Sequence, residues 1–250
     1  MSQSSRSLRW FGFYLTWVFV TTLAWTIALA IGLAIVGWLA PRWDVRSLFP
    51  FGVQLGAGVI QFLSTAVYYA PAAASLGLLV GLGQWYTLRR MVKGAGWWFA
   101  PTVVGSALGF LVALAAYSVL VNTFGWLGVV LAGVAGGLAA VVWQFYPLSR
   151  WVRGAAWWLL VCGLAWAAVP LAFLLVSYLP RVDLGALFGV GVFDLISGAI
   201  VGTVSGLVIG VVGAAVMIAL VAHTERHFED LLKRRMASSV AERRPPANAT

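Results

Sequence analysis

Long apolar stretches separated by short polar connections dominate this chain. Six of them approach or exceed the roughly 20 helical residues needed to cross a hydrocarbon core of about 30 Å. They are residues 13–39, 70–88, 97–121, 126–146, 157–179 and 200–222. Because backbone polar groups in lipid must be bonded within their own segment, the pattern predicts an all-α, polytopic membrane bundle of about six spans.

Two apolar runs are too long for one simple span. Residues 51–88 and 185–223 would each reach nearly 60 Å if wholly helical. We therefore expect additional helical segments at the outer face, over 51–69 and 186–199, lying in the interface or partly re-entrant. The transmembrane domain then comprises residues 1–223, and residues 224–250 form a basic cytoplasmic tail.

Composition supports a membrane location. Hydrophobic residues make up 62% of the chain and charged residues only 9%, whereas soluble domains are about 25% charged. Such a sequence could not supply the polar surface of a soluble protein. The single cysteine, Cys162, excludes an intramolecular disulfide and a thiolate metal cluster.

The net charge of +9 is distributed as membrane topology requires. With six spans, thirteen of the 16 lysines and arginines fall on the side that holds both termini. This asymmetry predicts that both termini are cytoplasmic. We interpret the basic tail as a segment that contacts anionic lipid headgroups. Nucleic-acid binding is the alternative, which we do not adopt.

An internal repeat links two pairs of spans. Residues 84–98 return as residues 144–158 without a gap, and the Gln, Tyr, Leu, Arg, Val, Gly, Ala, Trp and Trp of the pattern are identical. Each copy ends one span, forms a basic turn and opens the next span with a Trp pair. We expect these pairs, 97/98 and 157/158, to form an aromatic belt at headgroup level.

A weaker third copy begins in the first span. Trp17 and Trp25 share the spacing of Trp158 and Trp166, and Arg9 stands in place of the basic turn. The chain would then be built from three parallel hairpins, spans 1–2, 3–4 and 5–6, around a pseudo-threefold axis.

The repeated Gln-aromatic-x-x-Leu-x-Arg…Trp-Trp pattern resembles a loosely defined group of uncharacterised multi-spanning bacterial membrane proteins. The resemblance covers residues 81–110 and 137–166. It implies a bacterial inner membrane and a helical hairpin array, and it carries no activity.

Glycines recur every fourth residue along the last span. A stripe of small residues lets another helix backbone approach closely. Tight packing inside the bundle is the first interpretation, and docking of a partner helix or a second copy is the alternative. The stripe consists of Gly198, Gly202, Gly206 and Gly210.

Candidates for chemistry are few. Gln84 and Gln144 lie about one turn from the basic interface, where they would hydrogen-bond a neighbouring helix or a loop carbonyl, or form a polar ring at a cytoplasmic gate. His223 and His227 are four residues apart, and we interpret them as a solvated helix exit rather than a metal site. Asp194 is expected to be an interfacial carboxylate or an acid in an outer vestibule.

No motif for a reaction or a cofactor is present in the sequence. We therefore expect a non-enzymatic structural or accessory protein, whose partners are the lipid bilayer and either another membrane protein or further copies of itself. A small permease or channel for a neutral or apolar solute is the second hypothesis, and a membrane enzyme acting on lipid is the third. A packed axis with an exposed apolar groove would favour the first hypothesis, and a polar, water-filled axis the second.

Overall fold

The computed structural model of the chain describes residues 3–39, 57–90, 95–177 and 192–242, and all regular structure in these ranges is helical. Within these described ranges, six helical segments are long and apolar enough to cross a membrane. These spans are Leu8–Leu39, Ala66–Leu88, Ala95–Phe124, Trp126–Trp151, Ala155–Val176 and Asp194–Thr224. The prediction of a multi-pass helical membrane protein is confirmed.

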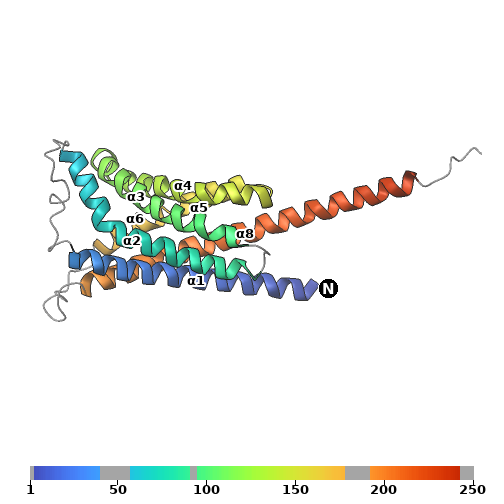
Figure 1. Cartoon of the computed structure of the whole chain (residues 1–250), viewed down its shortest axis with the longest axis horizontal. Coiled ribbons are helices and arrows are strands. Elements are labelled where there is room, and N and C mark those ends of the chain that lie inside the picture. The colour runs from blue at the N-terminus through green and yellow to red at the C-terminus, as the bar shows by residue number, and fades with distance from the viewer. Residues whose placement is uncertain (1–2, 40–56, 91–94, 178–191, 243–250) are drawn as a thin grey trace, which may run out of the picture.

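The first three spans are formed by long helices. Helix α1 covers Gln3–Leu39 and α2 covers Ala57–Leu88. A 3₁₀ turn, η2 (Ala95–Trp98), leads directly into α3 (Phe99–Phe124). Figure 1 shows α2 turning away from the bundle towards its N-terminal end, and the helix contains Pro71, whose missing N–H and bulky ring favour such a bend.

The last three spans include a broken helix. Helix α4 covers Trp126–Trp151, and the next span consists of α5 (Ala155–Ala165) and α6 (Ala168–Ser177). The break between α5 and α6 precedes Pro170, which lacks the N–H that an uninterrupted helix would use. Helix α8 (Val192–Glu242) is the longest and runs past the end of the bundle (Figure 1).

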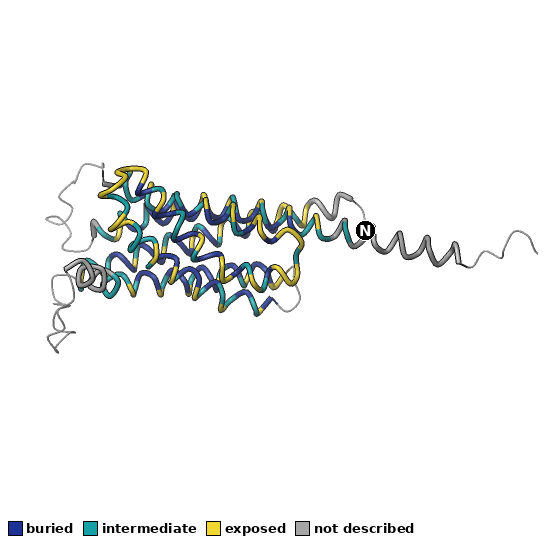
Figure 2. Tube along the Cα trace, turned by 90° about the horizontal axis from the view of Figure 1, so that it is seen from above, coloured by how far each residue is buried: buried dark blue, intermediate teal, exposed yellow. Residues whose placement is uncertain are grey.

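The spans pack in a closed ring. Along the chain, α1 contacts α2, α2 contacts α3, α3 contacts α4 and α4 contacts α5. Both halves of the broken span, α5 and α6, contact α8, and α8 contacts α1 extensively, which closes the ring. Buried and exposed residues alternate along each span at helical spacing (Figure 2). The outward faces carry large apolar side chains, such as Phe19 and Leu160, as expected of surfaces that contact lipid.

The two ends of the bundle differ in charge. One end, which we call the basic end, carries Arg89, Arg90, Arg150 and Arg153 and lies where α1 begins and α8 leaves the bundle (Figure 1). We call the opposite end the far end, and the halves of the bundle next to them the basic half and the far half.

The predicted additional segments at 51–69 and 186–199 lie partly outside the described residues. Residues 57–69 continue into the second span as one helix, and residues 192–199 continue into the last span. An interfacial or re-entrant placement of these segments stays a prediction.

Candidate functional site

The two repeated glutamines make the same hydrogen bond. Trp98 Nε1 donates to Gln84 Oε1 at 3.1 Å, and Trp158 Nε1 donates to Gln144 Oε1 at 2.9 Å. All four side chains are buried. Each bond joins the end of one span to the start of the next, so it closes the basic turn from inside the bundle. This is the interhelical bonding that we expected as one of the two roles of the glutamines.

Thr102 links the two copies. Gln144 Nε2 donates to Thr102 Oγ1 at 3.2 Å, and Thr102 Oγ1 in turn donates to the carbonyl oxygen of Trp98 at 2.8 Å. Thr102 is fully buried on α3. Since every polar atom of this chain of bonds is shielded from lipid, the network orients α3, α4 and α5 relative to one another.

The second tryptophan of each repeated pair meets a third in the centre of the basic half. The ring centroids of Trp98 and Trp158 are 5.4 Å apart, and both lie 6.4 Å from the centroid of Trp17 on α1. All three contacts have the edge-to-face geometry that aromatic quadrupoles favour. We call these three residues the tryptophan triad.

The belt prediction was therefore wrong for the second member of each pair. Trp98 and Trp158 are 0% and 2% exposed, whereas Trp157 is 63% exposed, as an interfacial residue would be. Trp97 is half-buried and stacks on Trp151. The Gln residue 14 positions earlier was the signal that could have identified the buried tryptophan, because a buried indole N–H needs an acceptor.

The third member of the triad lacks a glutamine. Trp17 Nε1 is buried and has no hydrogen-bond partner among the described residues. The position that faces it on α8 is Gly213, where an added Cβ atom would lie 3.3 Å from Trp17 Nε1. Gly213 thus lies beside the Trp17 indole nitrogen without a side chain that could accept from it.

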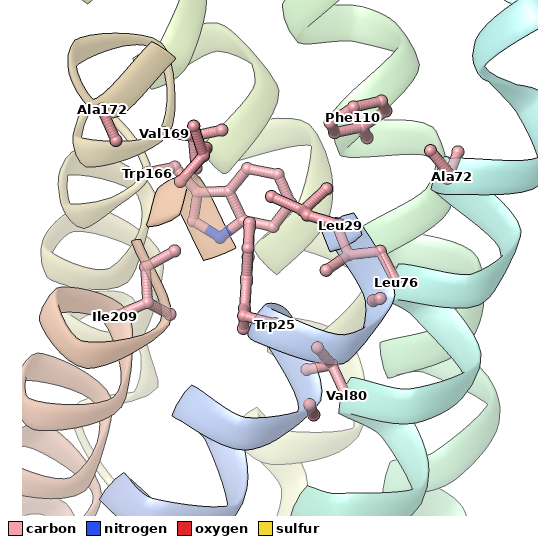
Figure 3. Close-up of a cluster of buried hydrophobic side chains, with 14 of the residues drawn as sticks. Trp25, Leu29, Ala72, Leu76, Val80, Phe110, Trp166, Val169, Ala172 and Ile209 are labelled. Carbon is pink, nitrogen blue, oxygen red and sulfur yellow. The ribbon is translucent and has the colours of Figure 1, made fainter. Parts of the chain in front are cut away.

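A second aromatic pair lies one layer towards the far end. Trp25 and Trp166 pack edge to face with their centroids 5.2 Å apart (Figure 3). Between this pair and the triad lies a cavity of about 20 Å³, bordered by Gln84, Gln144 and Cys162. This is the volume of about one water molecule. The centre of the bundle is therefore packed at this level.

A larger cavity lies in the far half. It has a volume of about 260 Å³ and is bounded by α2, α3, α4 and α6. The described residues of its walls are apolar except for the hydroxyls of Tyr69 and Tyr117. Sequence reasoning missed this cavity, because it arises from the packing of four helices rather than from a motif.

The glycine stripe of the last span faces α1. A Cβ atom added to Gly206 would lie 2.7 Å from the Cβ of Trp25 and 2.9 Å from the Cα of Thr22. Gly198 and Gly202 similarly meet the backbone of α1, at Leu29 and Trp25, and Gly210 lies against Val18. Because α1 covers the whole stripe, the stripe is not a free surface for a partner helix.

The remaining candidates lie apart from the tryptophan triad. His223 is exposed near the end of the last span, and His227 makes a hydrogen bond with Arg153. Among residues whose side chains are described, no group of three metal-ligating side chains is found. Asp194 is half-buried in the first turn of α8, where its carboxylate lies against Gly37 of α1.

No protein-family model matches the sequence, and comparisons with curated proteins and with solved structures also give no match.

Proposed function

We propose that this chain is a non-enzymatic structural or accessory component of a membrane assembly. The observation that carries the proposal is the packed centre of the basic half. The tryptophan triad and the pair Trp25–Trp166 fill it, and the cavity between them holds only about 20 Å³. A permeating solute would need these interlocked rings to separate.

The same contacts support a construction from three hairpins. In two copies, Gln and Trp join consecutive spans, and Gly213 faces Trp17 at the junction of the last span with the first. The matched positions Trp17 and Trp158 contact each other, as do Trp25 and Trp166. The basic end faces the cytoplasm of a bacterial inner membrane in this proposal, with both termini on that side.

The only cysteine provides a direct test of the packed centre. Cys162 is 3% exposed and borders the central cavity. In sealed vesicles, a small water-soluble methanethiosulfonate reagent is expected to modify Cys162 far more slowly than a cysteine at the exposed position 149. The control is Ser149→Cys in a Cys162→Ser background. Comparable rates at the two positions would mean that water reaches the centre.

The accessory role is tested by the mass of the intact complex after gentle purification from native membranes. A partner present in fixed stoichiometry, and retained across several mild detergents, is the expected result. A monomer without a partner would count against it, whereas a homo-oligomer would mean assembly from copies of this chain alone.

A permease for a neutral or apolar solute is the second candidate, and one observation favours it. The far half holds the 260 Å³ cavity while the basic half is packed, as in a carrier that is open on one side. Solute flux in liposomes, together with rapid labelling of Cys162 during flux, would establish this alternative.

A further inference from the structure

We propose that the cavity in the far half binds an acyl chain of a membrane phospholipid. The proposal goes beyond the accessory role and does not depend on it. It rests on the depth, the chemistry and the volume of the cavity.

The cavity lies at the depth of the hydrocarbon. Its walls include Tyr69, three residues inside the second span, and Phe110, 14 residues before the end of the third. At about 1.5 Å per helical residue, the cavity extends from near the far end to roughly 20 Å inside the third span. The molecules that surround a span at this depth are lipid chains.

The cavity is partly open to its surroundings. Tyr117 on its wall is 45% exposed, and Leu114 and Phe173 are half-buried. The inner wall is buried, with Val129 and Val169 each 4% exposed. A flexible chain could therefore enter the cavity without the helices separating.

The chemistry of the walls suits a hydrocarbon. Among the described lining residues, only Tyr69 and Tyr117 offer a polar group, and an ordered water needs two to four polar partners. An apolar cavity of about 150 Å³ in another protein stays dry and binds benzene. A cavity of about 260 Å³ is larger than that and can take a longer, flexible chain.

Dispersion forces favour filling the cavity. Moving a lipid chain from the bilayer into the protein brings little hydrophobic gain, because both environments are apolar. However, side chains that line an empty space lose their contacts on that side. A chain inserted between α3 and α6 restores these contacts, so the cavity is expected to hold a lipid chain more persistently than the outer surface does.

The test uses a phosphatidylcholine with a diazirine near the end of one acyl chain, as a minor component of phosphatidylcholine vesicles containing the full-length protein. After irradiation, peptide mapping measures the yield of cross-links at Tyr117 and Phe173. The reference is Leu160, an exposed residue on the outward face of α5. We expect several-fold higher yields at the cavity residues than at Leu160.

A matched pair of variants assigns the labelling to the cavity. Leu114→Trp places a larger side chain on the cavity wall and should reduce cross-linking at Phe173 several-fold. Leu108→Trp makes the same change at an exposed position of the same helix and should leave it unchanged. Wild-type yields at Tyr117 and Phe173 no higher than at Leu160 would overturn the proposal, even if Leu114→Trp failed to fold.

Discussion

The basic half of the bundle and its far half are built from the same six spans, but they fill their centres differently. In the basic half, three tryptophans meet edge to face, and two of their indole nitrogens are bonded to glutamines. In the far half, the bend in α2 and the break between α5 and α6 accompany an apolar cavity of about 260 Å³. The first arrangement specifies one geometry, whereas the second leaves room for lipid.

The difference shows what membrane packing requires. Apolar side chains gain little by leaving lipid, so a membrane core is held by close contact and by interhelical hydrogen bonds. The basic half has both. Contact between α8 and α1 extends through both halves, because the glycine stripe begins near the far end and continues to Gly210, beside Val18.

The largest effect is expected from removing a member of the tryptophan triad. Trp98→Ala should cost about 3–5 kcal/mol of unfolding free energy, because it opens a cavity and deprives Gln84 of its donor. Phe173→Ala should cost less, about 2 kcal/mol, because Phe173 already borders a cavity and has fewer contacts to lose. Steric trapping in lipid bicelles measures both values. Equal losses would remove the energetic distinction between the two halves.

The next largest effect concerns the interface of α8 with α1. Gly206→Leu should destabilise the protein by about 3 kcal/mol, because the new side chain meets the backbone of α1 and cannot be relieved by a rotamer change. Gly12→Leu is the control, since an added Cβ at Gly12 meets nothing within 4 Å. The mass of the folded complex should stay the same in both variants. Loss of an oligomer without loss of stability would indicate that the stripe binds another chain instead.

The presence of six apolar helical spans could be predicted from the sequence, because the length of apolar runs is set by the thickness of the bilayer. The glutamine bonds could be predicted as a class, since a polar side chain inside a span must find a partner. Their actual partners could not. The Trp-Trp pairs at residues 97/98 and 157/158 have the sequence pattern of interfacial aromatics. The second member of each pair is buried only because of how the helices are arranged around it.

The cavity in the far half could not be predicted for a related reason. Pro71 and Pro170 are visible in the sequence as potential helix breakers, but their consequence depends on the neighbouring helices. Close approach of α4 to the break is permitted by Gly133, whose added Cβ would lie 2.7 Å from Pro170 Cγ. No local sequence pattern indicates that the space beside this contact, next to Phe110, remains an open cavity.

A smaller effect distinguishes the two glutamines. Gln144→Leu should cost about 1–2 kcal/mol, and Gln84→Leu less, because Gln144 both accepts from Trp158 and donates to Thr102. Thermal unfolding of both variants in the same detergent checks the order. Combining Gln144→Leu with Trp158→Phe should cost less than the sum of the two single changes. Strict additivity would show that the bond contributes nothing to stability.

The smallest effect is expected where the pattern of the basic half is incomplete. Trp17 Nε1 lacks a partner among the described residues, and Gly213 occupies the facing position. Gly213→Gln would place an amide oxygen beside this indole, as Gln84 does beside Trp98. The approach is tight, since the added Cβ would lie 3.3 Å from Trp17 Nε1, so the steric cost must be separated from the gain.

Gly213→Leu bears a similar steric cost without an acceptor. We therefore expect Gly213→Gln to be more stable than Gly213→Leu by about 0.5–1 kcal/mol. A downfield shift of the Trp17 indole proton should accompany the difference. If leucine and glutamine are equivalent at this position, Trp17 is not a third copy of the Gln–Trp junction, and the three-hairpin construction loses its energetic support.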